Sequence, residues 1–197
     1  MNKICTFATI VMTLGILIGC AGNRDLFKTV STSTRQDVFQ EIAHGAALVS
    51  GYADLRVYSS LKTHKPGIYS AKDIHGTADY KIIMNIDGQT VELLGDLQRE
   101  NSEARALNDP EAGEGMRYHF SKNIRIKVGT HKIVIAIPAD DLAIEREITL
   151  TAGSSNTLAF EPVYGNLPGK QRPGFYRDTS FTEGLKLFRV VLNGKYL

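Results

Sequence analysis

Two histidines and two aspartates fall within one short stretch of the chain and are residue types that bind metal ions. They are His64, Asp73, His75 and Asp79. Imidazole and carboxylate groups ligate divalent metals such as zinc when loop geometry brings them together. The sequence holds no HExxH motif and no histidine pair four residues apart, so nothing indicates a helical metal site. We interpret the four residues as solvated loop side chains, and predict no metal and no other cofactor.

Other carboxylates and serines could serve hydrolysis. Asp140 and Asp141 follow Pro138 directly, and neighbours in a turn usually point apart, whereas catalytic carboxylates must converge on one bond. We assign them the commoner role of capping backbone amides in a turn. Ser154 and Ser155 lack the GxSxG setting of a nucleophile elbow. The sequence therefore predicts no enzyme. The alternative, a cell-wall or carbohydrate hydrolase or a metal-dependent enzyme, requires carboxylates or histidines to converge in a pocket.

Basic and aromatic side chains offer two candidate surfaces for a partner. The first is a set of cations expected on the outward side of neighbouring segments, suited to anionic lipid or acidic polymer: Arg117, His119, Lys122, Arg125 and Lys127. A solvated sheet face with protective edge lysines accounts for the same residues. The second is the Pro/Gly-rich loop 166–179, with Lys170, Arg172, Phe175, Tyr176 and Arg177. Such a loop suits partner contact, although a long crossover between sheets would look alike.

The N-terminus has the layout of a secretory signal. Lys3 precedes an uncharged, apolar run over residues 4–19, which is shorter than the roughly 20 residues of a spanning helix. The run ends in Leu17-Ile18-Gly19-Cys20, which resembles the lipobox of bacterial lipoproteins. That resemblance implies a signal peptide over 1–19, cleavage before Cys20, and acylation of the Cys20 thiol. An uncleaved membrane anchor is the alternative. Because no aspartate follows Cys20, the resemblance favours the outer membrane of the bacterial envelope.

Composition narrows the function further. The chain has 23 basic and 21 acidic residues, and the signal removes only Lys3 among them. A near-neutral chain gives no electrostatic argument for nucleic acid as a partner. Cys5 leaves with the signal and Cys20 carries the lipid, so the exported domain has no disulfide and no thiolate chemistry. The chain has no tryptophan, which weakens a sugar-stacking platform.

The elements that must position these residues are mainly strands. Residues 20–34 are polar and Ser/Thr-rich and predict a lipidated tether. Val38, Ile42 and Ala46 share one face of a short helix predicted over 35–44. Alternation of period two then predicts strands, with a hairpin turn at Asp87-Gly88; they cover about 49–61, 80–86, 91–93, 118–128, 132–137, 144–150, 158–160 and 185–192.

The charged, glycine-containing stretch 95–115 predicts an exposed insertion between these strands. Short strands joined by turns favour an all-β, mainly antiparallel fold with one short N-terminal helix. We expect a single immunoglobulin-like or transthyretin-like β-sandwich domain over 35–197.

Part of the strand region, about 80–164, resembles the PEGA family of bacterial envelope modules. The resemblance lies in Ile86-Asp87-Gly88, in Val128-Gly129-Thr130-His131 before Lys132-Ile133-Val134-Ile135, and in Ala152-Gly153 before a last apolar strand. Val128 stands where the family usually has proline, and the stretch 95–121 separates the first hairpin from the rest. Such modules bind and scaffold, so the resemblance implies no catalytic residues. The prediction is a lipid-anchored, non-enzymatic envelope module that binds a protein partner or envelope polymer, with a purely structural spacer as a further possibility.

Overall fold

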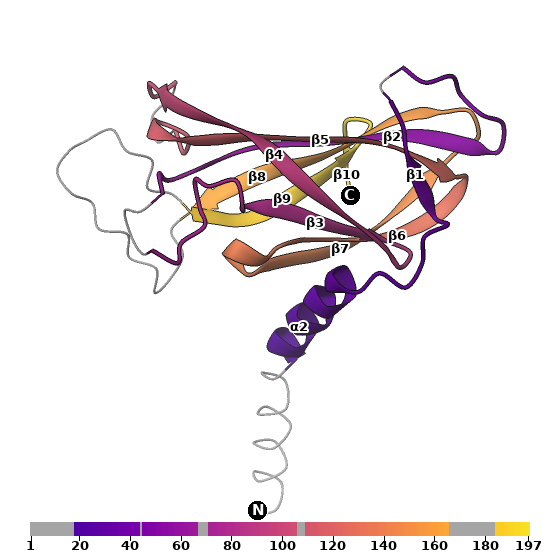
Figure 1. Ribbon diagram of the computed structural model, residues 1–197, viewed down its shortest axis with the longest axis horizontal. Helices are drawn as coiled ribbons and strands as arrows, with labels where there is room; N and C mark the ends of the chain where they lie inside the picture. Colours follow the sequence, from indigo (N-terminus) through magenta and orange to yellow (C-terminus); the bar gives the residue numbers. More distant parts are fainter. Residues whose placement is uncertain (1–17, 44, 67–70, 106–108, 166–183) are drawn as a thin grey trace, which may run out of the picture.

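The computed structural model describes residues 18–43, 45–66, 71–105, 109–165 and 184–197. Within these residues, one helix, one short 3-10 turn and ten strands follow one another (Figure 1). They are α2 (Ile18–Ser31), β1 (Phe39–Glu41), β2 (Tyr52–Thr63), β3 (Lys81–Ile86), β4 (Gln89–Ser102), β5 (Gly113–Lys127), β6 (Gly129–Ile137), η1 (Pro138–Asp140), β7 (Leu142–Leu150), β8 (Ser155–Gly165), β9 (Gly184–Leu192) and β10 (Lys195–Tyr196).

The strands form one continuous sheet in the order β10-β9-β8-β2-β5-β4-β3-β6-β7, and β1 pairs with β5 beside this path. The prediction of an all-β fold is confirmed. The sheet is mixed rather than purely antiparallel, because β2 and β8 pair in parallel over Asp54–Ser59 and Ser155–Phe160. The sheet curls, so that two sets of strands face each other across one core (Figure 1).

The sheet curls along strand β4, because the two halves of this strand pair with different neighbours. Lys81–Ile86 of β3 pairs with its first half, Gln89–Leu94, whereas its second half from Gly95 pairs with β5. A Cβ at Gly95 would lie 2.9 Å from the Phe120 ring, so a larger residue does not fit at this crossing. Beyond it, β1 pairs with Ile124–Ile126 of β5.

Side-chain alternation fills the inner face of the curl, as the period-two pattern predicted. In β2 the buried positions include Ala53, Leu55, Val57 and Leu61, and the other strands contribute in the same way. The Asp87-Gly88 hairpin is also confirmed, since both residues have positive φ, 46° and 95°. Core residues from every large strand join one cluster, so the curled sheet is held by a single hydrophobic core.

The predictions of a polar tether over 20–34 and of a helix over 35–44 were wrong. Residues 20–34 are not a polar tether, because α2 runs through Ser31 and packs against the outer face of the sheet. Leu26, Phe27 and Val30 of α2 contact a small cluster made by Ile83, Val134 and Ala136, with Ala143 at its edge. The predicted helix is not formed over the described residues 35–43, since Val38 and Phe39 donate backbone hydrogen bonds to the Gln89 side chain and Phe39 starts β1.

The stretch 95–115 is not an exposed loop insertion but the end of a long hairpin. Gly95–Ser102 and Gly113–Phe120 pair as β4 and β5, and cross-strand ion pairs such as Arg99 with Glu114 account for the dense charge. Within the part of the chain that the structure describes, no helix has the length and apolar character to cross a membrane.

Candidate functional site

Four titratable side chains, three from the connection between β2 and β3 and one from η1, meet beside the end of β2. His64 directly follows β2, Asp73 and His75 lie between β2 and β3, and Asp140 ends η1 between β6 and β7. We call these four residues the His–Asp cluster. Its exposed fractions are small, at 3% for the His64 side chain, 15% for Asp73, 12% for His75 and 3% for Asp140.

The Asp73 carboxylate lies between the two imidazoles. His64 Nε2 is 2.6 Å from Asp73 Oδ2, and His75 Nδ1 is 2.5 Å from Asp73 Oδ1. The other nitrogen of His75, Nε2, is 3.2 Å from Asp140 Oδ1. The Tyr80 hydroxyl donates a 2.6 Å hydrogen bond to Asp140 Oδ2. His75 is therefore held at both ring nitrogens, and each carboxylate has two side-chain partners.

These contacts shift the ionisation of the cluster. Burial alone would raise the pKa of Asp73, but hydrogen bonds from His75 and His64 lower it to about 2. Burial alone would lower the pKa of His75, but Asp140 and Asp73 outweigh it and raise that pKa. The pKa of Tyr80 is raised well above its ordinary value by burial and by the Asp140 charge. Tyr80 therefore stays protonated and remains a donor to Asp140.

The loop that carries Asp73 and His75 is fixed by Gly76 and Thr77. Gly76 has a φ of +73°, and a Cβ there would lie 2.7 Å from the His64 carbonyl oxygen. The backbone can therefore close on His64 only with glycine at this position. One step further, the Tyr118 hydroxyl donates a 2.6 Å hydrogen bond to the Thr77 carbonyl, which ties the loop to β5.

An aromatic row supports the cluster from beneath. The ring of His75 lies 5.2 Å from that of Tyr80, and Tyr80 lies 4.8 Å from Tyr118. Tyr80 and Tyr118 are both fully buried. The cluster therefore packs against buried aromatic side chains of the core and is not a set of solvated surface groups.

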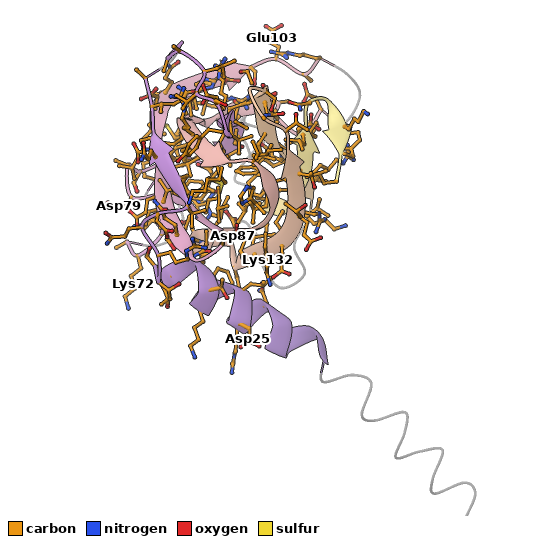
Figure 2. All side chains as sticks on the ribbon, turned by 90° about the vertical axis from the view of Figure 1, so that its right-hand side faces the viewer. Asp25, Lys72, Asp79, Asp87, Glu103 and Lys132 are labelled. Atoms are coloured by element: carbon orange, nitrogen blue, oxygen red, sulfur yellow. The ribbon has the colours of Figure 1, made fainter. Side chains whose placement is uncertain are left out.

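A shallow pocket of about 370 Å³ opens onto one side of the cluster. It is lined by Lys72, Asp73, Ile74, His75, Pro138 and Ala139. Figure 2 shows Lys72 at the outer margin of the molecule, as it also shows Asp79. Asp73 and His75 are therefore reachable from solvent, while His64 lies behind them.

The structure corrects the prediction that these are solvated loop residues. It brings together His64, Asp73 and His75 from the predicted set and adds Asp140, whereas Asp79 is exposed. The Asp140 carboxylate accepts hydrogen bonds from the side chains of His75 and Tyr80 and does not cap a turn. The backbone turns at the next residue, Asp141, where φ is +54°. Two features of the sequence pointed to this site. They are the spacing of Asp73 and His75, two residues apart, and the position of Tyr80 on the inward-facing side of the strand predicted over 80–86.

His131 also departs from its prediction as an exposed residue at a strand start. It is 7% exposed, with Nδ1 2.7 Å from Asp87 Oδ2 and Nε2 2.7 Å from the Lys127 carbonyl oxygen. Asp87 also accepts the Lys132 backbone amide, which links the β3–β4 turn to β6. The imidazole of His131 therefore connects the β3–β4 turn, through Asp87, to the turn between β5 and β6, through the Lys127 carbonyl.

The predicted cationic surface is largely neutralised by acidic partners. Arg117 is buried and forms paired hydrogen bonds to both Glu100 and Glu111. Beside it, Lys62 is 1% exposed and donates to Ser102 Oγ and to the carbonyls of Glu111 and Gly113. These ion pairs and hydrogen bonds connect the β4–β5 hairpin to β2. The charged groups of Arg117 and Lys62 are therefore not available to a partner.

The other predicted surface residues have different surroundings. Arg125 binds Asp54 through two hydrogen bonds, and Lys122 pairs with Glu41. In the β2–β5 register Lys122 lies opposite Val57, on the core-facing side, so it does not share a face with Arg117. His119 and Lys127 are exposed. Lys170, Arg172, Phe175 and Tyr176 lie outside the described residues.

Comparison with known proteins gave no match: no family model, no curated protein and no solved structure resembles the chain significantly. The resemblance to PEGA modules therefore stays a prediction from the residues.

Proposed function

We propose that the chain is a lipid-anchored, non-enzymatic module of the bacterial envelope that binds a protein partner or envelope polymer. The observation that carries this proposal is Leu17-Ile18-Gly19-Cys20 at the end of an uncharged apolar run. Cys20 is the acylated residue, residues 1–19 are the signal peptide, and the absence of aspartate after Cys20 favours the outer membrane.

The docking of α2 supports a short connection between lipid and domain. Cys20 lies in the first turn of α2, and Val30 near its other end is fully buried against the sheet. Ten residues of helix span about 15 Å. In this proposal the lipid and the folded domain are joined by a short rigid helix, so the domain stays close to the membrane surface and works there.

The partner-binding part of the proposal rests on the exposed basic residues His119 and Lys127 and on the segment 166–179, which the sequence predicts to be a loop. Arg117, Lys122 and Arg125 contribute ion pairs within the domain instead. As a finer fold assignment we retain an immunoglobulin-like or transthyretin-like sandwich of PEGA type. The two facing parts of the curled sheet support it, and the parallel β2–β8 pair is the feature that such an assignment has to accommodate.

Metabolic labelling tests the anchor. Cells expressing the chain are fed labelled palmitate, and the protein is followed through membrane fractionation. We expect label in the wild type and none in Cys20→Ala, which should also accumulate as uncleaved precursor. An unlabelled wild type that fractionates without the membrane would refute the anchor.

Partner binding is tested separately in intact cells by crosslinking. The loop 166–179 is replaced with a Gly/Ser linker of equal length, and the crosslinked adducts are compared with those of the wild type. We expect specific adducts to disappear while the domain stays folded. Identical adducts for both chains would remove this loop from the proposal.

A further inference from the structure

The His–Asp cluster contains three groups placed as metal ligands. His64, Asp73 and His75 each offer one ligand atom, and these atoms lie within 4.8 Å of one another. Two imidazoles and one carboxylate are a ligand set that suits zinc and neighbouring divalent transition metals. We propose that His64, Asp73 and His75 bind one such ion through His64 Nε2, one Asp73 carboxylate oxygen and His75 Nδ1.

The distances are compatible with a tetrahedral site. Zinc binds nitrogen and carboxylate oxygen at about 2.0–2.2 Å, which places two tetrahedral ligands about 3.3 Å apart. The present separations of 2.6 Å and 2.5 Å from Asp73 to the imidazoles are hydrogen-bond lengths and must open by less than about 1 Å. The three ligand atoms, which now lie within 4.8 Å of one another, must also draw together to about 3.3 Å. Binding replaces the protons on the two ligating nitrogens, which leave to solvent as the ion enters.

The surroundings of His75 match those of a metal-bound histidine. Its Nε2 faces Asp140, so the Nε2–H tautomer leaves the Nδ1 lone pair directed at the Asp73 side, where the ion would lie. Asp140 is in turn fixed by the Tyr80 hydroxyl. A carboxylate that orients a ligating imidazole through its other nitrogen is the usual outer partner of a metal site.

The pocket beside the cluster supplies the entry path. It is lined by Asp73 and His75 but not by His64, so an ion enters from that side and meets the buried imidazole last. Three protein ligands leave a fourth position for water or an incoming donor atom. Lys72 also lines this pocket, so the fourth position favours a small anionic donor, such as a carboxylate or phosphate group.

His131 provides a matched control for the test. It is buried like His64 and bonded to one aspartate, Asp87, yet its second nitrogen donates to the Lys127 backbone carbonyl, and among the described residues no second imidazole shares the Asp87 carboxylate. His131→Gln therefore perturbs a buried His–Asp pair without removing any proposed ligand.

The experiment uses the full chain purified in detergent and stripped with a chelator. Cobalt(II) is titrated and followed by its visible absorption, and zinc is then added as competitor. We expect one equivalent to give the intense bands of a tetrahedral nitrogen and oxygen site, and zinc to abolish them. A near-ultraviolet thiolate-to-cobalt band would instead place the ion on a cysteine and overturn the proposal.

Variants assign the ligands. Asp73→Asn and His75→Gln are expected to lose stoichiometric binding, whereas Asp140→Asn should weaken binding by about 10-fold to 100-fold because it removes the outer partner. His131→Gln should bind as the wild type does. Far-ultraviolet circular dichroism shows which variants fold, and Asp73→Asn is the decisive one since it changes a single atom. A folded wild type that binds no metal, or a folded Asp73→Asn that binds normally, overturns the proposal.

Discussion

The Tyr80 hydroxyl donates a 2.6 Å hydrogen bond to Asp140 inside the protein, joining the entry of β3 to the turn after β6. Tyr80 is fully buried, and the Asp140 side chain is 3% exposed. A buried carboxylate is costly unless its oxygens are hydrogen-bonded. Tyr80 and His75 satisfy one oxygen each, and this allows Asp140 to be retained in the interior.

Tyr80→Phe tests that relationship. The variant keeps the aromatic packing but leaves a buried carboxylate oxygen without its donor, which should lower the free energy of unfolding by about 1–3 kcal/mol. Urea unfolding of the full chain in detergent measures the change. Tyr196→Phe is the control, because Tyr196 is 66% exposed and bonds Glu161 at the surface. Equal losses in the two variants would contradict the assignment.

Gly76→Ala tests how the loop closes on the cluster. The alanine must adopt a φ of +73° and its Cβ would meet the His64 carbonyl at 2.7 Å, so both strain and contact oppose it. We expect a loss of more than about 1–3 kcal/mol, the usual cost of a left-handed non-glycine residue alone. Thermal unfolding provides the measurement.

Gly153→Ala is the matched control for that prediction. Gly153 has a φ of +65°, but nothing lies within 4 Å of its added Cβ. It therefore reports the conformational cost without the collision. If Gly153→Ala were as destabilising as Gly76→Ala, the close approach of the loop to His64 would contribute nothing.

Several strands were predictable because they alternate apolar and polar residues along their length. Tyr52–Thr63 is the clearest case, and the Asp87-Gly88 turn follows from local turn chemistry. The parallel β2–β8 pair was not predictable, since it joins segments about 100 residues apart and nothing local encodes the partner. The crossing at Gly95 was hidden in the same way, because its reason is the Phe120 ring on another strand.

Contacts on the outer face of the sheet explain why the segment 20–34 was predicted as a tether and not as a helix. Ile83 and Asn85 alternate with the inward-facing residues of β3, yet both are buried on the outer face, with Asn85 donating to the Thr29 carbonyl of α2. A polar segment with only three apolar contacts in one helical stripe looks like a linker until its docking face is known. Tertiary packing, not helix propensity, selects α2 there.

The cluster could be listed from the sequence but not assembled from it. Asp73 and His75 are two residues apart, and their convergence with His64 depends on the positive φ at Gly76. Asp140 comes from a turn 65 residues beyond His75, so only the closed sheet brings it near. Residue types predict which groups can do chemistry, whereas long-range strand pairing decides which of them meet.

The docking of α2 gives a further prediction. Val30→Asp would bury an unpaired charge against Ile83 and Val134, so α2 should leave the sheet while the inner core remains folded. Hydrogen exchange should show lost protection over Ile18–Ser31 and retained protection in β2 and β5. Arg24→Asp, at an exposed position of the same helix, is the control. Unchanged protection of α2 in Val30→Asp would show that the contact does not hold the helix.

Acid should weaken the β4–β5 hairpin through Glu100. Its hydrogen bonds with Arg117, reinforced by the charges of Arg117 and Lys62, lower the pKa of Glu100 to about 2. In the unfolded chain the pKa of a glutamate is about 4.3, so the pKa of Glu100 is lower in the folded state. The stabilisation is then fully present above about pH 4.5 and is lost as pH falls towards 2. The lowered pKa of Glu111 adds to the same trend.

Urea midpoints measured across this acidic range test the prediction. Glu100→Gln should lower the free energy of unfolding by about 1–2 kcal/mol at neutral pH, the lower part of the range for charged hydrogen bonds because the side chain is 30% exposed. It should also make the decline of stability with acid shallower, since one of the groups that take up a proton in this range is gone. Glu92→Gln removes an exposed ion pair with Lys81 and should cost less than about 1 kcal/mol. If Glu100→Gln and the wild type lost stability in parallel as the pH fell, Glu100 would not be the group whose protonation loosens the hairpin.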